Sequence, residues 1–247
     1  QGDPIIQLTP ALQAMLAETD LATDLPADFF RSPYPIAYIE FARPNPLRIP
    51  NQYSGLHECE GAYLGIYERP AGDEVFAFSA QTQALKLDPS KPVRVVEIVV
   101  TGSPVGKQHA LDDASDNLML LIQDEDECLQ DVLNRHIAWY LDPMAYEQPG
   151  MAPLRADDVE MIRPVVDLLA KALLYLNLND ADQNTISERS DLERKLKRLG
   201  YKKANRLQKR LAGTYDRILI GPDFPESEQP DSEVGESHRS VKAHWRR

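Results

Sequence analysis

The stretch VRVVEIVV at residues 93–100 is built almost entirely from β-branched residues, with one Arg and one Glu among them. Such residues are enriched in β-strands because their branched side chains pack well on a pleated surface. The stretch therefore predicts a strand, and three earlier segments share its β-branched and aromatic composition. These segments are PIAYIEFA (35–42), GAYLGIYE (61–68) and EVFAFSAQ (74–81).

Turn-forming residues separate these strands. RPAGD at 69–73 has the character of a hairpin turn, in which Gly72 can take a positive φ, and LDPSKP at 87–92 supplies the next turn. Strands that follow one another so closely, with no helix between them, favour an antiparallel meander. NLMLLIQ at 117–123 is either a further strand or the start of a helix, since periodicity does not decide for a short apolar run.

Helical segments flank the predicted sheet. Thr9 is a good N-cap and Pro10 a good first residue for a helix over residues 10–18. A block of four acids at 124–127 precedes a helix with a broad apolar face over 128–141. The acids then lie at the N-terminal turn, where the helix dipole favours negative charge.

A long helix follows, which Asp157 or Asp158 caps and which runs to about residue 178. Pro164 either kinks this helix or starts a second segment. Because the segment is apolar nearly all round, we expect it to be buried, and DRILIG at 216–221 predicts a last strand. We therefore predict an α+β fold, in which an antiparallel sheet meander carries an N-terminal helix and several C-terminal helices, as a single domain over residues 1–221.

The last part of the chain, residues 222–247, changes composition. PDFPESEQPDSEVGES at 222–237 has six acids, three prolines and no base, which predicts a disordered or extended segment. The following residues are basic and include Trp245. Since a Trp beside cations can stack on a base or dock in a pocket, we predict a partner-binding segment at the end of the tail. Its residues are His244, Trp245, Arg246 and Arg247. The alternative is that the tail folds back onto the acidic surface of the domain.

Charge is unevenly distributed along the chain. The net charge is −12, which argues against a nucleic-acid binder of the basic-domain type, yet residues 188–210 hold ten Lys or Arg and only three acids. On a helical wheel the leucines of this stretch share one side, and cations spaced by four form a ridge on the other. Such a ridge suits the phosphates of RNA.

We predict that this cationic ridge binds nucleic acid through Arg194, Lys195, Arg198, Lys202, Arg206 and Lys209. A helix break at Gly200 would divide it into two patches. The alternative is a solvated face that the chain's own acids neutralise, either those at 124–127 or those at 223–236.

Motifs for metal or catalytic chemistry are weak. In HECE at 57–60, His57 and Cys59 share one face of a strand, but two ligands do not make a zinc site. His136 lacks a nucleophile partner, and the chain has neither a phosphate-binding loop nor a GxSxG motif. We predict no metal and no cofactor, and we assign no catalytic residue.

The segment KQHALDDASDN at 107–117 gathers His109, Asp112, Asp113 and Asp116. A hydrolytic carboxylate cluster is conceivable there, although a flexible loop is the simpler interpretation. The two cysteines, Cys59 and Cys128, form no disulfide framework and fit a reducing, cytoplasmic location. The longest apolar stretch, 165–176, is too short and too charged to span a membrane.

The tail VKAHWRR at 241–247, after an acidic linker and a body of α and β segments, resembles a family of anti-CRISPR proteins from phages and plasmids. It is the second-named family of those that act against the type V-A CRISPR nuclease. In that family the His-Trp-Arg-Arg stretch leads into a further basic and aromatic segment, so we expect sequence beyond Arg247. The resemblance carries over by position only for the four residues 244–247 and places no catalytic residue.

The resemblance implies an inhibitor that suppresses the production of the nuclease. The family is associated with recognition of the nuclease's N-terminal segment during translation and with loss of the corresponding mRNA. The partners implied are therefore that nascent segment and the translating ribosome or the mRNA. An extended peptide could add to an edge of the sheet or bind its face.

Two other functions stay open at this point. One is a plasmid-maintenance or regulatory protein that uses the cationic ridge to bind nucleic acid. The other is an RNA-cleaving enzyme that uses acids such as Asp112, Asp113 and Asp116.

Overall fold

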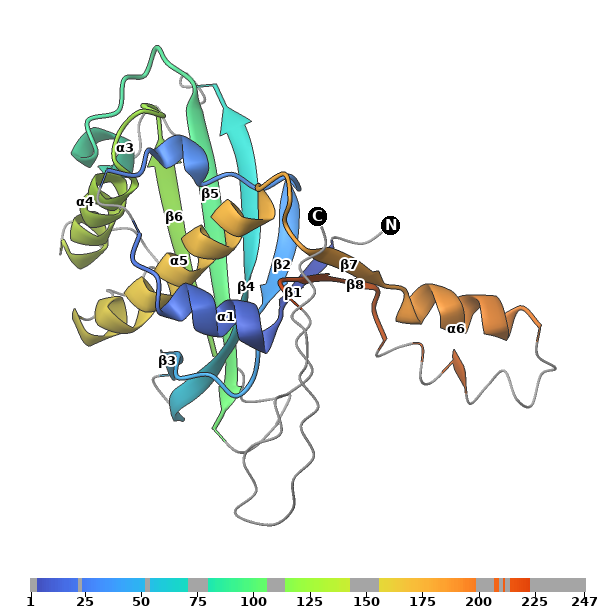
Figure 1. The fold of residues 1–247 in the computed structure, drawn as a ribbon. Helices are drawn as coiled ribbons and strands as arrows, with labels where there is room; N and C mark the ends of the chain where they lie inside the picture. The colour runs from blue at the N-terminus through green and yellow to red at the C-terminus, as the bar shows by residue number, and fades with distance from the viewer. Residues whose placement is uncertain are drawn as a thin grey trace, which may run out of the picture.

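The computed structural model describes residues 4–21, 24–51, 54–70, 80–105, 114–142, 156–198, 207–208, 211 and 214–222. An eight-stranded sheet forms its centre, and helices lie across one face of that sheet (Figure 1). The strands are β1 (Ile5–Leu8), β2 (Ile36–Glu40), β3 (Arg48–Asn51), β4 (Gly55–Arg69), β5 (Val93–Pro104), β6 (Ala114–Ile122), β7 (Gln183–Ile186) and β8 (Arg217–Ile220). The helices are α1 (Pro10–Ala17), the short 3-10 helix η1 (Ala27–Phe29), α3 (Ala80–Ala84), α4 (Leu129–Leu141), α5 (Ala156–Leu176) and α6 (Glu188–Leu196).

The predicted meander is confirmed. β2, β4, β5 and β6 lie side by side and antiparallel, and β5 pairs with β4 from Val93 to Pro104. The ambiguous segment at 117–123 is strand β6. The predicted strand at 74–81 is not found where it can be tested: 74–79 lie outside the described residues, and Ala80 and Gln81 belong to α3.

The sequence analysis did not anticipate three strands, and one of them, β1, makes the sheet mixed because it pairs in parallel. The three strands are β1, β3 and β7. β1 lies between β2 and β8 and runs parallel to both, with Ile5 opposite Tyr38 on one side and Arg217 on the other. β7 pairs antiparallel with β8 and is the last strand of the order β6-β5-β4-β2-β1-β8-β7.

The core lies between the sheet and helices α1, α4 and α5 (Figure 1). Alternate residues of the strands face these helices, as the period of two requires. Leu64 and Ile98 from the sheet and Val165, Leu169 and Leu173 from α5 belong to one buried cluster. α5 continues through Pro164, whose side chain is on an exposed position, so the predicted second segment is not formed.

Two of the four acids at 124–127, Glu125 and Glu127, form ion pairs with arginines of the body. Arg94 is buried, donates to the carbonyl oxygens of Ala27 and Phe30, and forms a two-pronged ion pair with Glu125. Glu127 pairs with Arg135 of α4. These two acids of the block are therefore engaged by arginines of the body and not by the cationic ridge.

The outer edge of β6 is closed by side chains. The Leu121 amide donates to Nε2 of His136 (2.7 Å) and the Met119 amide to the hydroxyl of Tyr140 (3.0 Å), both from α4. The Asn117 amide donates to the carboxylate of Asp116 (2.9 Å). Three alternate amides of this edge strand, those of Asn117, Met119 and Leu121, therefore have a side-chain acceptor, although no strand lies beyond β6 in the described chain.

Candidate functional site

α6 carries the described part of the predicted cationic ridge. Arg194 and Lys195 lie in its last turn and Arg198 follows it; all three are exposed, whereas Leu192 is buried. Arg194 pairs with Asp191 of the same helix at 3.2 Å. Among the described residues no carboxylate lies within ion-pair distance of Lys195 or Arg198. Lys202, Arg206 and Lys209 of the ridge, and residues 244–247 of the tail, lie outside the described residues.

Asp216 fixes the start of α6 to the start of β8. Its Oδ1 accepts the amides of Arg189 (2.9 Å) and Ser190 (3.1 Å), and its Oδ2 accepts the Ser190 hydroxyl (2.5 Å). Ser187 precedes the helix but makes no capping bond, so Asp216 acts as the N-cap from a distance. The hydrogen bonds from Ser190 hold the pKa of Asp216 below its ordinary value.

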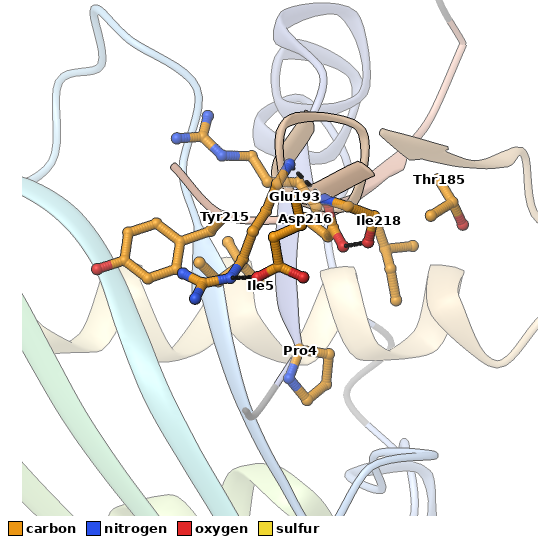
Figure 2. A pocket seen from close by; sticks show the side chains of 10 residues that line it. Pro4, Ile5, Thr185, Glu193, Tyr215, Asp216 and Ile218 are labelled. Carbon is orange, nitrogen blue, oxygen red and sulfur yellow. Dashed lines mark hydrogen bonds and ion pairs between the residues drawn. The ribbon is translucent and has the colours of Figure 1, made fainter. Parts of the chain in front are cut away.

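β7, β8 and α6 project from the body, and Figure 1 shows α6 at the far end of this projection. We call these three elements the arm. Where the arm joins β1 there is a pocket of about 840 Å³ (Figure 2). Apolar and charged side chains both line it: Pro4, Ile5, Tyr215 and Ile218, with Arg189, Glu193, Asp216 and Arg217, beside Thr185 and Ser190.

The two arginines of the pocket differ in how fully they are bound. Arg189 is held by Glu193 at 3.0 Å and by the carbonyl oxygen of Thr214 at 3.4 Å. Arg217 reaches Gln7 at 3.3 Å and lies 3.5 Å from Glu40, and both contacts use its Nη1. The Nε of Arg217 has no hydrogen-bond partner in the described part of the chain. Arg217 is therefore the under-satisfied cation of the pocket.

The other candidates from the sequence have structural roles. His57 and Cys59 share the buried face of β4 as predicted, and His57 Nε2 lies 2.8 Å from the Ser54 hydroxyl. Burial raises the pKa of Cys59 to about 12, so its thiol stays protonated. Within the described residues no three His, Cys, Asp or Glu side chains are grouped to hold a metal ion.

His136 supports the fold from a buried position. Its Nε2 accepts the Leu121 amide, so Nδ1 carries the proton and donates to the Val132 carbonyl oxygen at 2.7 Å. Burial lowers its pKa to about 4. Of the acids at 112–116 only Asp116 is described, and burial raises its pKa. Asp112 and Asp113, like His109, lie outside the described residues, so no carboxylate cluster can be assembled from them.

A family comparison covers nearly the entire chain. The model of the AcrVA2-like family, anti-CRISPR type V subtype A2, matches residues 6–247. The chain belongs to this family. The resemblance inferred from the tail is thereby confirmed, and the anti-CRISPR function is that of the family. No curated protein and no solved structure matches the chain. None of the described helices is both long and apolar enough to cross a membrane.

The sequence analysis did not predict most of the residues that line the pocket. Its residues come from the start of β1, from β7, from α6 and from the start of β8, and these segments are far apart in the sequence. The basic character of 188–210 and the predicted strand at 216–221 pointed to this region. No local motif could have indicated the pocket, because pairing between β1 and β8 creates it.

Proposed function

We propose that this anti-CRISPR protein suppresses production of the type V-A nuclease by recognising the nuclease's N-terminal segment as it is translated, with loss of the corresponding mRNA. The protein acts in the cytoplasm, where translating ribosomes and mRNA are the surroundings of its target. Family membership supports the nuclease as the ultimate target. The observation that supports contact with RNA is the exposed positive charge on the arm.

The arm separates positive charge from an otherwise acidic protein. Its helix α6 presents Arg194 and Lys195 outward, and Arg198 continues the same surface. The acidic block at 124–127 engages arginines of the body instead. Lys195 and Arg198 have no carboxylate within ion-pair distance in the described chain, whereas Arg194 pairs with Asp191. Exposed cations of this kind suit the phosphates of ribosomal or messenger RNA.

The undescribed part of the basic stretch belongs to the same proposal. Lys202, Arg206 and Lys209 extend the ridge, and His244, Trp245, Arg246 and Arg247 contact the partner. An indole among cations fits either a base or an aromatic-lined pocket. The protein then holds the nascent peptide at one surface and RNA at another, and it needs no catalytic residue of its own to mark the message.

A reporter experiment separates recognition of peptide from recognition of message. The N-terminal coding segment of the nuclease is fused to a reporter in two altered forms. Synonymous recoding keeps the peptide and changes the mRNA, whereas a compensated frameshift keeps the mRNA almost intact and changes the peptide. We expect the protein to lower reporter mRNA after recoding but not after the frameshift. The opposite pattern, or unchanged mRNA in both, would contradict the proposal.

Charge reversal tests the ridge. One double variant carries Arg194→Glu and Arg198→Glu. The matched control carries Lys86→Glu and Lys91→Glu, which change two exposed cations of the body by the same charge. Co-sedimentation with ribosomes at low salt is measured for both double variants. Loss of phosphate contacts should weaken association about tenfold in the first pair only. Equal association of both pairs would remove the ridge from the proposal. Metal-dependent cleavage of RNA by the purified protein would instead favour an enzyme.

A further inference from the structure

The outer edge of β7 has no further strand beside it in the described part of the chain. We propose that this edge binds an extended peptide segment by strand addition, and that the neighbouring pocket receives one side chain of that peptide. This inference rests on the proposed function and specifies where the nascent segment binds. It follows from the hydrogen-bond pattern of β7, the contrast with β6 and the composition of the pocket.

The pairing of β7 with β8 determines which peptide groups point outward. The Gly221 amide donates to the Asp182 carbonyl oxygen at 2.9 Å, which makes these two residues a hydrogen-bonded pair just beyond the strands. Hydrogen-bonded pairs alternate in an antiparallel ladder, so Asn184 also faces β8. Gln183 and Thr185 therefore direct their N–H and C=O groups away from the sheet.

These outward groups have no partner among the residues that the structure describes. The equivalent amides of β6 donate to His136, Tyr140 and Asp116. No described side chain covers β7 in this way, and the strand contains no Lys, no Pro and no register shift. A Lys, a Pro or a register shift usually protects an edge strand from pairing with another strand, and β7 lacks all three. An added strand would complete the hydrogen bonding of Gln183 and Thr185.

The pocket lies beside this edge because Thr185 lines it (Figure 2). Side chains of an extended peptide alternate between two faces, so one of them can enter the pocket when the backbone pairs with β7. Ile5, Ile218 and Tyr215 offer an apolar wall. Arg217 contributes a guanidinium that is held only by long contacts of its Nη1, to Gln7 at 3.3 Å and to Glu40 at 3.5 Å. The geometry suits a side chain with an apolar stem that ends in an oxygen acceptor, such as Glu or Gln.

The length of β7 favours a peptide over a second copy of the chain. The strand has four residues, of which two point outward. Stable protein interfaces bury roughly 1,200–2,000 Å² in total, which a strand of this length cannot supply alone. A peptide binds through fewer contacts, gains specificity from the pocket and is released again.

Backbone methylation of a peptide gives the sharpest test. The probe is a synthetic peptide with the N-terminal sequence of the type V-A nuclease, N-methylated at one position at a time, and binding to the wild-type protein is measured by fluorescence anisotropy. We expect affinity to fall about tenfold at every second position within a short window and to change little between them. Uniform sensitivity or none overturns strand addition. Complete absence of binding by the unmodified peptide overturns the proposed function as well.

Protein variants test the same edge from the other side. Thr185→Pro removes an outward N–H that has no partner among the described residues, whereas Thr185→Val keeps it and serves as the matched control. We expect peptide affinity to fall about tenfold in the first and to stay within about threefold in the second. Equal affinities overturn the inference. Should the Pro variant unfold, the methylation pattern and hydrogen-exchange protection of the Gln183 and Thr185 amides on the wild-type protein decide.

The pocket is tested with the same peptide. Each Glu or Gln of the peptide is replaced in turn by Leu, which removes the oxygen acceptor and keeps the bulk. We expect one of these replacements to lower the affinity of the peptide for the wild-type protein about tenfold. The same replacement should hardly change the affinity of the peptide for the Arg217→Leu variant. Equal losses in both proteins overturn the assignment of the pocket. Size-exclusion chromatography that finds a dimer broken by Thr185→Pro would assign the edge to a second copy instead.

Discussion

The two edges of the sheet have opposite chemistry. At β6, three outward amides in alternation donate to side chains, two of which come from α4. At β7, the outward groups of Gln183 and Thr185 find no such acceptor in the described chain. Unpaired edges promote association with other strands, which is why folds normally cover them. This contrast between the two edges is the reason why we assign peptide binding to β7.

The largest effect is expected at the centre of the closed edge. His136→Ala leaves the Leu121 amide without its acceptor and opens a cavity beneath α4, so the free energy of unfolding should fall by about 4 kcal/mol. Urea denaturation measures this loss. Gln130→Ala on the exposed side of α4 is the control, with a change within about 0.5 kcal/mol. A similarly small change for His136→Ala would show that this contact does not hold the edge.

The same side chain makes the closed edge sensitive to acid. In the unfolded chain His136 takes up a proton near its ordinary pKa of 6.5, but in the folded protein only near 4. The unfolded state therefore binds more protons in this window, and stability is lost as the pH falls from 6.5 towards 4, by about 3 kcal/mol. Denaturation curves across this range should show the loss in the wild type. His136→Gln should lack this share of the pH dependence.

Proline substitutions at two neighbouring positions of β7 distinguish the edge that pairs with β8 from the outward edge. Asn184→Pro removes an amide that bonds to β8 and should lower the free energy of unfolding by about 2 kcal/mol. Thr185→Pro removes an outward amide and should change it by no more than about 0.5 kcal/mol. Thermal denaturation of the two variants compares them directly. If both cost the same, Gln183 and Thr185 do not point outward and the open edge is misassigned.

The smallest effect concerns a single hydroxyl at the closed edge. Tyr140→Phe leaves the Met119 amide without its acceptor while the ring keeps its packing, so we expect a loss of about 1 kcal/mol. Hydrogen exchange of the Met119 amide should accelerate in this variant, and exchange at Leu121 should not. Unchanged exchange at Met119 would mean that water or another group already serves that amide.

The elements that sequence analysis found are those with a strong apolar pattern. The strands of the meander carry β-branched or aromatic residues on a buried face, and helices α4 and α5 carry apolar faces long enough to recognise. The predicted helix at 10–18 is confirmed as α1 because its cap, Thr9, accepts the Leu12 amide. Local chemistry was sufficient in each of these cases.

The missed elements lack that pattern for identifiable reasons. β7 reads QNTI and lies at an edge, so most of its side chains are exposed and show no alternation. β1 has four residues directly before the first helix, and β3 contains Pro50, which is atypical of a strand. The site depends on these missed strands. The basic stretch at 188–210 could be predicted as a cationic surface, but the pocket and the open edge required the pairing of β1 with β8.

That pairing joins residues more than two hundred positions apart, since Ile5 lies opposite Arg217. Contacts of such long sequence separation form late and cost the most loop entropy. A ribosome that is still making this protein can expose the β2–β6 meander before β8 has been translated. The arm depends on β8, so it is expected to assemble after the meander. A chain that lacks β8 would present the meander without the edge to which we assign peptide binding.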